Sequence, residues 1–279
     1  MSIDLHCHST ISDGALSPGE VVRRAHEHGC TLLALTDHDH TGGLVEARQQ
    51  AQQLGMRLIN GVEISVTWRA RSIHVVGLDF DDRHEGLQQL LAQVRAGRIM
   101  RFQAMAAKLA HKGIADALVG ASALVTNPDM PSRTHLAQFL VDNGHVRNKA
   151  EAFRKYLGEG KPCCVKHQWA DLGETIGAIT AAGGLAVIAH PMRYDLSATA
   201  KRNLFEEFKA LGGVAIEVHS GRSSLNDRLN YALLAERFDL MASCGSDFHR
   251  VGDFGGGDLG RCPELPPICQ PVWTRFQAA

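Results

Sequence analysis

The 279-residue sequence lacks the segments that would direct it into or across a membrane. No apolar run reaches the roughly 18 residues that a bilayer-spanning helix needs. The start of the chain has no basic segment followed by an apolar stretch, so we expect no secretion. No C-x-x-C pair occurs among the seven cysteines, which argues against a zinc ribbon or a thioredoxin-like site. We therefore expect a cytoplasmic protein with reduced thiols and no membrane association.

Neither sign of charge dominates the composition. The chain has 29 Lys and Arg against 30 Asp and Glu, a net charge of −1. This balance argues against a general electrostatic nucleic-acid binder, although it leaves room for a local basic groove. The hydrophobic content of 44% is that of an ordinary globular protein. The outlier is histidine, with 15 residues, and histidine is the commonest metal ligand among side chains.

Two of these histidines occur two residues apart near the start of the chain. Residues 3–8 form a predicted strand, and strand side chains alternate between faces, so His6 and His8 point the same way. Two imidazoles on one face can hold a divalent metal. Two surface histidines on an edge strand would give the same pattern, so this motif alone is weak evidence.

Six further apolar runs predict strands, and helical patterns separate most of them. The runs cover residues 31–36, 57–62, 72–78, 185–189, 214–218 and 240–244. Such alternation predicts parallel β/α units. Histidine, aspartate and glutamate occur at or near the strand ends, which is where β/α barrels place their catalytic groups.

The alternation breaks between about residues 82 and 166. Helical patterns cover residues 87–109, 134–143 and 149–156, with proline and glycine between them. We expect residues 99–166 to form a small all-helical insertion domain that contributes to substrate binding. Residues 1–98 and 167–279 then form the barrel that carries the metal site.

The strand-end residues make up a set of nine candidate metal ligands. They are His6, His8, Asp13, His38, Glu63, His74, His190, Asp247 and His249. One tetrahedral zinc needs about four ligands, so nine predict two or three divalent ions. Glu63 could bridge two of them, and the mixture of imidazole and carboxylate suits manganese, zinc or iron. Individually, each residue could be a hydrogen-bonded core histidine, a turn residue or a helix cap.

These motifs resemble those of the PHP family, named for polymerase and histidinol phosphatase. The matching segments are residues 4–8, 36–39, 61–63, 189–191 and 245–249. The resemblance implies an α/β fold, a distorted (β/α)7 barrel similar to that of amidohydrolases, with up to three metals. It assigns His6, His8, Glu63 and Asp247 to a first ion, Glu63, His74 and His190 to a second, and Asp13, His38 and His249 to a third. Some phosphatases of the family have histidine where this chain has Asp13, which leaves the third ion's identity open.

Within the family, the insertion resembles that of enzymes acting on nucleotides and RNA. Residues 132–137 and 156–160 carry this likeness, which implies phosphate binding by Arg133 and His135. A guanidinium can fork onto a phosphate, and we favour this role for Arg133 over a surface ion pair.

The resemblance implies a metal-dependent phosphoric monoester hydrolase. We expect hydrolysis of the 3′-phosphate of nucleoside 3′,5′-bisphosphates by a hydroxide bridging the first two metals, most simply manganese. Asp247, His249 or metal-bound water would protonate the leaving oxygen.

Other activities fit the same residues. They are a 5′-to-3′ exoribonuclease acting on short 5′-phosphorylated RNA, a histidinol phosphatase, a hydrolase of C–N bonds, and a non-catalytic binding module. The expected partner is a small nucleotide or short RNA, and nothing in the sequence calls for an obligate protein partner.

Overall fold

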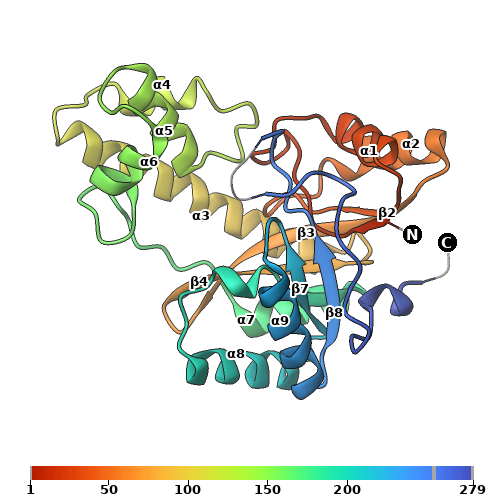
Figure 1. Cartoon of the computed structure of the whole chain (residues 1–279). Coiled ribbons are helices and arrows are strands. Elements are labelled where there is room, and N and C mark those ends of the chain that lie inside the picture. Colours follow the sequence, from red (N-terminus) through yellow and green to blue (C-terminus); the bar gives the residue numbers. More distant parts are fainter. Residues whose placement is uncertain (1, 253–255, 278–279) are drawn as a thin grey trace. The chain divides into compact units, whose positions relative to one another are not determined.

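The computed structural model describes residues 2–252 and 256–277 and divides the chain into two compact units. Unit 1 consists of Met1–Leu91 and Ala170–Ala279, and unit 2 of Ala92–Trp169 (Figure 1). The boundary between them falls within helix α3 (Glu85–Ala110). Within the described residues, no helix has both the length and the apolar character to span a bilayer.

Unit 1 is built on a mixed sheet that curls into a nearly closed barrel. Its strands are β1 (Ser2–Asp4), β2 (Cys30–Leu35), β3 (Arg57–Trp68), β4 (Arg71–Leu78), β5 (Ala170–Asp171), β6 (Leu185–Ile188), β7 (Ala215–Ser220) and β8 (Met241–Gly245). Seven of them follow the order β1-β2-β3-β4-β6-β7-β8, and β5 pairs with β3. Backbone hydrogen bonds join the two ends of this order, since Leu5 N donates to Cys244 O at 2.9 Å. The expected distorted seven-stranded barrel is confirmed.

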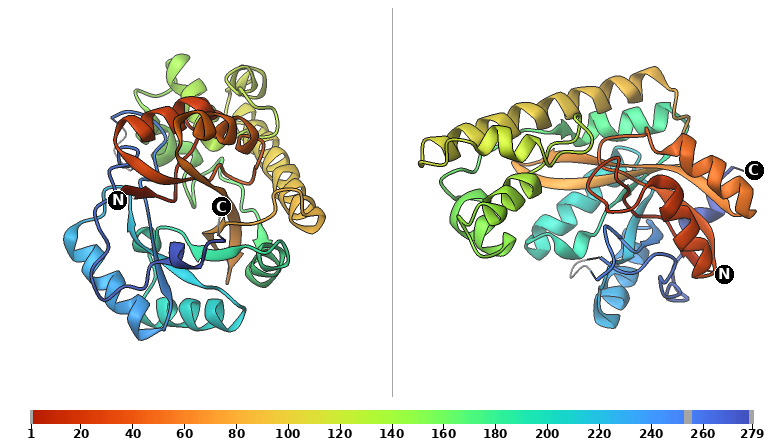
Figure 2. Two further views of the ribbon diagram at one scale, coloured as in Figure 1. Left: turned by 90° about the vertical axis from the view of Figure 1, so that its right-hand side faces the viewer. Right: turned by 90° about the horizontal axis from the view of Figure 1, so that it is seen from above.

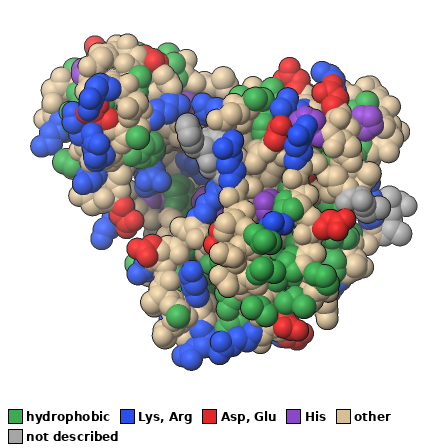
Figure 3. All heavy atoms as spheres, viewed as in Figure 1, with side chains coloured by type: hydrophobic (Ala, Val, Ile, Leu, Met, Phe, Trp, Pro, Cys, Tyr) green, Lys and Arg blue, Asp and Glu red, His purple; other side chains and the backbone are tan. Residues whose placement is uncertain are grey.

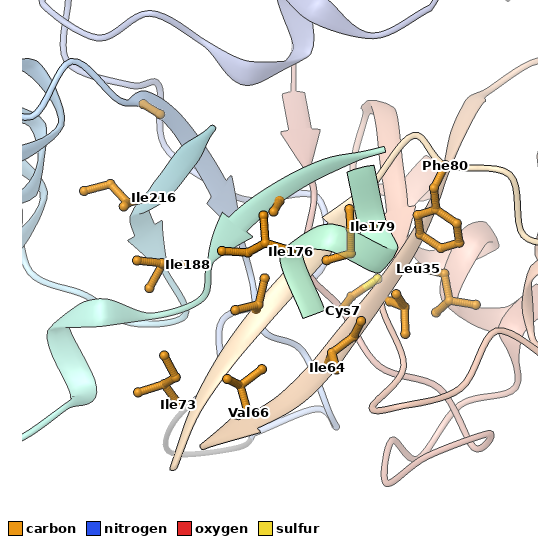
Figure 4. Packing of buried hydrophobic residues seen from close by; sticks show 14 of the residues in the cluster. Cys7, Leu35, Ile64, Val66, Ile73, Phe80, Ile176, Ile179, Ile188 and Ile216 are labelled. Atoms are coloured by element: carbon orange, nitrogen blue, oxygen red, sulfur yellow. The ribbon is translucent and has the colours of Figure 1, made fainter. Parts of the chain in front are cut away.

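Helices cover the outside of this barrel (Figure 2). They are α1 (Pro18–Glu27), α2 (Leu44–Leu54), α7 (Leu172–Ala181), α8 (Ala198–Ala210) and α9 (Leu225–Arg237). Unit 1 also contains the 3₁₀ turns η2 (Pro191–Arg193) and η3 (Val272–Arg275). Between helices and strands lies a large hydrophobic core, in which Ile176 and Ile179 of α7 face Ile64 and Val66 of β3 (Figure 4). Burial of such side chains, at about 25 cal/mol per Å², is what fixes the helices on the sheet.

The middle of the barrel differs from the expected run of parallel units. Strand β3 continues past Val62 to Trp68, and β4 returns antiparallel to it. Arg69 and Ala70 form the turn with positive φ angles of 45° and 62°, the backbone that a two-residue hairpin requires. Asn or Gly usually marks such a turn, so these two residues gave no sign of it. Glu63 therefore lies within a strand and not at its end.

The start of the barrel also departs from the predicted strand over residues 3–8. Strand β1 ends at Asp4, and the histidines follow outside any regular strand. Backbone bonds hold this segment to the residues after β8: Asp247 N donates to His6 O at 2.7 Å, and His8 N donates to Phe248 O at 2.9 Å. The buried Asp4 carboxylate reinforces the link by accepting from Ser246 N at 2.8 Å. The two ends of the barrel are thus joined where the candidate ligands lie.

The regular elements described in unit 2 are all helical. They are the continuation of α3, then α4 (Ala117–Ser122), α5 (Arg133–Asp142), α6 (Lys149–Ala152) and the π-helical turn η1 (Phe153–Leu157). The three helical patterns of the sequence correspond to α3, to α5, and to α6 together with η1, whereas α4 was not predicted. Unit 2 has a hydrophobic core of its own, in which Met105 and Leu109 of α3 and Leu136 and Leu140 of α5 are fully buried.

The close packing of Gly245 on His6 provides a test of this link. A Cβ atom at Gly245 would lie 2.2 Å from the His6 Cβ, so Gly245→Ala must displace the His6 segment. We expect it to lower the free energy of unfolding by about 1–3 kcal/mol, as overpacking does. Urea denaturation followed by circular dichroism measures this change.

Gly177→Ala is the matched control. Gly177 lies within α7 with nothing within 4 Å of the added methyl group, so alanine should raise the stability by up to about 1 kcal/mol. A Gly245→Ala protein that is as stable as the wild type would show that the two segments are not tightly packed.

Candidate metal centre

The carboxylate of Glu63 lies at the centre of a group of imidazoles. It is fully buried on β3, and its two oxygens face different histidines. Oε1 lies 2.8 Å from His74 Nδ1 on β4 and 2.8 Å from His190 Nε2, which follows β6. The antiparallel hairpin accounts for the first contact, because it places His74 beside β3.

The second oxygen of Glu63 belongs to a four-atom cluster. Glu63 Oε2 lies 3.3 Å from both His6 Nε2 and His8 Nε2. Asp247 Oδ1 completes the cluster, 3.5 Å from His6 Nε2 and 3.2 Å from His8 Nε2. Two ligands bound at about 2.1 Å to one tetrahedral ion lie about 3.4 Å apart, so the spacing is that of ligands around a shared ion. Among the described residues, no donor makes a well-directed hydrogen bond to Glu63 Oε2, as expected of an oxygen placed to bind metal.

A third set of donors adjoins the first. His249 Nε2 lies 3.3 Å from Asp13 Oδ1, and His38 Nε2 lies 3.8 Å from the same oxygen. His38 also reaches Glu63, with Nδ1 2.8 Å from Oε2. The ring of His8 stacks on that of His249 at 4.3 Å, so His8 borders both the first and the third cluster.

The structure therefore brings all nine candidate ligands together within unit 1. The donor set of imidazoles and carboxylates fits divalent manganese, zinc or iron. The division of the ligands among individual ions stays a prediction. Arg133 and His135, the candidate substrate residues, belong to unit 2.

Two of these ligands have a strained backbone. His190 and Asp247 have φ angles of 30° and 47°, in the left-handed region that residues with a Cβ avoid. Such conformations cost on the order of 1–3 kcal/mol each and cluster at functional sites. They occur directly after strands β6 and β8, where His190 contacts Glu63 and Asp247 contacts His6 and His8.

Burial and neighbouring charges set the ionisation of the cluster. Burial opposes ionisation of Glu63 and Asp247, but the surrounding histidines outweigh it and hold the pKa of both carboxyl groups well below the usual range. Burial, followed by repulsion from His249 and His38, lowers the pKa of His8 to about 3. At neutral pH the two carboxylates are therefore charged and His8 is neutral, which are the forms that bind metal.

His249 behaves differently. Burial opposes its protonation, but Asp13 and Asp247 outweigh that effect and raise the pKa of His249 to about 10. A metal ion bound by this imidazole at neutral pH must therefore displace its proton.

Glu217 on β7 supports two of the ligands, a role that the sequence reading missed. Its Oε1 lies 2.6 Å from His6 Nδ1, and its Oε2 accepts a hydrogen bond from His190 N at 2.6 Å. A carboxylate on Nδ1 keeps the proton there and leaves His6 Nε2 as the metal-binding nitrogen. The sequence feature that could have indicated this role is that Glu217 is the single acidic residue of a largely apolar strand.

Arg193, which also went unnoticed in the sequence, contacts the same centre. It lies in η2, three residues after His190, and forms an ion pair with Asp247 Oδ2. This pairing turns Asp247 Oδ1 toward His6 and His8. It also places a guanidinium beside the metal ligands, where a phosphate oxygen would have to be neutralised.

The contact between Glu217 and His6 predicts a loss of metal affinity in Glu217→Gln. The amide keeps the size of the side chain but loses the charge that fixes His6. We expect manganese affinity to fall by about 10–100-fold, the usual effect of removing such an outer partner. Isothermal titration calorimetry with Mn²⁺ measures it.

Glu206→Gln serves as the control, because Glu206 is exposed on α8, where it forms a long ion pair of 4.0 Å with Arg202. Wild-type affinity in Glu217→Gln would mean that His6 is oriented without this carboxylate.

The chain resembles a known family and several characterised proteins over most of its length. A model of the PHP domain matches residues 4–221. A 3′,5′-nucleoside bisphosphate phosphatase of Chromobacterium violaceum is 50% identical over 277 residues, covering 99% of this chain and 97% of that protein. A 5′-3′ exoribonuclease of Haemophilus influenzae is 44% identical over 273 residues, covering 98% of each.

Solved structures agree with these matches. An amidohydrolase from Chromobacterium violaceum with bound sulfate and no metal superposes with a TM-score of 0.92 at 49% identity, covering 98% of this chain and 95% of that one. A proposed metal-dependent phosphoesterase from Bifidobacterium adolescentis gives a TM-score of 0.80 at 27% identity, covering 95% and 93%. The barrel, the ligand motifs and these likenesses lead to one conclusion: the chain belongs to the PHP domain family.

Proposed function

We propose that this protein removes the 3′-phosphate from nucleoside 3′,5′-bisphosphates, such as adenosine 3′,5′-bisphosphate, giving a nucleoside 5′-monophosphate and phosphate. The observation that carries the proposal is the set of imidazole and carboxylate atoms gathered around Glu63, which are placed to bind metal ions. The phosphatase that is 50% identical to this chain over nearly its full length supports the choice of substrate.

Three groups of residues would hold the ions. His6, His8, Glu63 and Asp247 would hold the first, Glu63, His74 and His190 the second, and Asp13, His38 and His249 the third. Divalent ions, for which we expect manganese, would supply hydroxide at neutral pH and offset the negative charge of the phosphate. Glu63 is the residue common to the first two groups, because its two oxygens face different sets of imidazoles.

The protein's own side chains complete the reaction. Arg193, already paired with Asp247, offers a guanidinium to a phosphate oxygen at the centre. The leaving 3′-oxygen needs a proton. Because Asp247 is ionised at neutral pH and His249 gives up its proton on binding the third ion, we propose that these two residues pass a proton from water to that oxygen. These two residues are coupled, because His249 Nδ1 lies 3.0 Å from the Asp247 carbonyl oxygen and 3.8 Å from Oδ1.

Arg133 and His135 would bind the phosphate that is not hydrolysed. Both lie in the first turn of α5, where backbone N–H groups favour an anion. Ser132 N donates to His135 Nδ1 at 3.0 Å, so in the neutral ring the proton lies on Nε2. That N–H is a donor suited to a phosphate oxygen. Binding energy from this second phosphate would position the reacting one.

A second candidate activity is 5′-to-3′ hydrolysis of short 5′-phosphorylated RNA. The 5′-3′ exoribonuclease of Haemophilus influenzae, 44% identical to this chain, favours it. The same metal centre and the same phosphate-binding residues would serve both reactions, because both substrates carry a 5′-phosphate.

Phosphate and mononucleotide release from a substrate panel tests the proposal. Manganese-loaded protein is offered adenosine 3′,5′-bisphosphate, 3′-AMP, 5′-AMP, histidinol phosphate and a 5′-phosphorylated oligoribonucleotide. We expect the bisphosphate to be preferred over both monophosphates. Arg133→Ala should raise the KM for the bisphosphate at least about tenfold, because a charge-assisted bidentate contact is lost.

The control is Arg147→Ala, which removes an arginine from the same unit. Arg147 is 82% exposed and pairs with Glu151 four residues away, so its loss should have little effect. Mononucleotide release from RNA with higher kcat/KM than for the bisphosphate would move the assignment to an exoribonuclease. If the manganese-loaded protein hydrolysed none of the substrates in the panel, both the phosphatase and the exoribonuclease activity would be ruled out.

A further inference from the structure

Helix α9 exposes a row of leucines on its outer side. Its inner side packs on the barrel, where Tyr231 and Ala235 are only 4% and 1% exposed. Leu225, Leu229 and Leu233 recur every four residues, so they line one face of the helix, and 59%, 46% and 56% of their surfaces are exposed. Figure 3 shows hydrophobic side chains gathered over this helix. We call these three residues the leucine row.

The leucine row differs from the scattered apolar residues that any protein surface carries. Single exposed leucines are common, whereas contiguous exposed apolar side chains mark interaction surfaces. In the described part of the chain, no other helix leaves three large hydrophobic residues exposed. Ile268, which is 45% exposed, lies near the C-terminal end of the row: burial and then the charge of Glu236 raise the pKa of the adjacent Cys269 thiol to about 11.

Opposite charges flank the leucine row at equal distances. Arg222 lies three residues before Leu225, and Glu236 lies three residues after Leu233. Both side chains are exposed, and neither has an ion-pair partner among the described residues. Arg222 Nε donates to Gly256 O at 3.1 Å, which leaves the remaining N–H groups of the guanidinium available. The spacing of the five residues is therefore the same in both directions, and only the charge changes sign.

A second copy of this chain fits such a pattern. In a contact with two-fold symmetry each residue pair occurs twice, so the surface must be complementary to itself. Antiparallel pairing about Leu229 places Leu225 beside Leu233 of the second copy. It also places Arg222 beside Glu236 of the second copy, because each lies seven residues from Leu229. Parallel pairing would bring the two Glu236 carboxylates together, and like charges facing each other oppose association.

We propose that α9 pairs antiparallel with α9 of a second copy of this chain, with the leucine row at the centre and an ion pair between Arg222 and Glu236 at each end. A helix of 13 residues is about 20 Å long and about 10 Å wide, so it covers less than the roughly 800 Å² that each partner buries in a standard interface. The dimer is therefore weak and depends on protein concentration.

Sedimentation velocity of the full-length protein, from micromolar to nearly millimolar concentration, measures this equilibrium. We expect the wild type to dimerise and Leu229→Asp to stay monomeric at every concentration, because the two-fold axis brings the two new carboxylates together. Leu118→Asp is the matched control: Leu118 is 42% exposed on α4, so this variant should dimerise like the wild type. Manganese affinity, measured by calorimetry, should be unchanged in both variants if they are folded.

Charge reversal tests the antiparallel register and the identity of the partner. Glu236→Arg places two arginines together at each end of the contact, and Arg222→Glu places two glutamates together. Each single variant should weaken dimerisation at least tenfold. The double variant Arg222→Glu/Glu236→Arg restores opposite charges, so its dissociation constant should return close to the wild-type value. Both positions are exposed, which keeps this test valid if Leu229→Asp folds poorly.

Several outcomes would overturn the proposal. They are a wild type that is monomeric over the whole concentration range, a dimer that persists in a folded Leu229→Asp protein, and single charge reversals that have no effect. A double variant that stays as weak as the single ones would refute the antiparallel pairing, because only that pairing restores the contact. None of these measurements requires turnover, so they decide the inference independently of the proposed function.

Discussion

The structure of unit 1 depends on one buried carboxylate. Glu63 places a negative charge in the barrel, where an unpaired ion would be very costly, and five imidazoles surround its two oxygens. Imidazoles crowded together would themselves repel if they were all protonated. Divalent ions would resolve both problems, because they bind carboxylate and neutral imidazole together. The strained backbone of His190 and Asp247 is consistent with a fold that holds these ligands at a cost in stability.

The sequence was sufficient to predict the barrel and to single out the nine candidate ligands that the structure brings together, since both follow from short-range patterns. The spacing of His6 and His8 and the acids and histidines near strand ends are visible in the chain itself. The β3–β4 hairpin is not visible in the sequence. Arg69 and Ala70 adopt the positive φ angles of its turn, but neither is the glycine or asparagine that usually indicates such a turn. As a result Glu63 and His74 meet across antiparallel strands, and the expected parallel unit is absent there.

The side chains that support the candidate ligands could not be predicted from the sequence for a different reason. Glu217 and Arg193 act through contacts with residues 211 and 54 positions away in the chain, and no local pattern announces such pairs. The basic character of unit 2 was likewise masked by the balanced charge of the whole sequence. Residues 92–169 include 12 Lys and Arg but only 5 Asp and Glu, so only the division into two units separates a +7 segment from an acidic remainder. The net charge of unit 2 taken by itself, and not that of the whole chain, indicates an anionic substrate.

Electron paramagnetic resonance of the manganese-loaded protein tests the central claim most directly, namely that Glu63 bridges two ions. Two Mn²⁺ ions that share a carboxylate are magnetically coupled, so the account predicts a spectrum of a coupled pair. Glu63→Ala should replace that spectrum with the signal of isolated ions. Uncoupled signals from a wild-type protein that holds two or more manganese ions would contradict the account, because the ions would then be bound without the shared carboxylate around which the site is built.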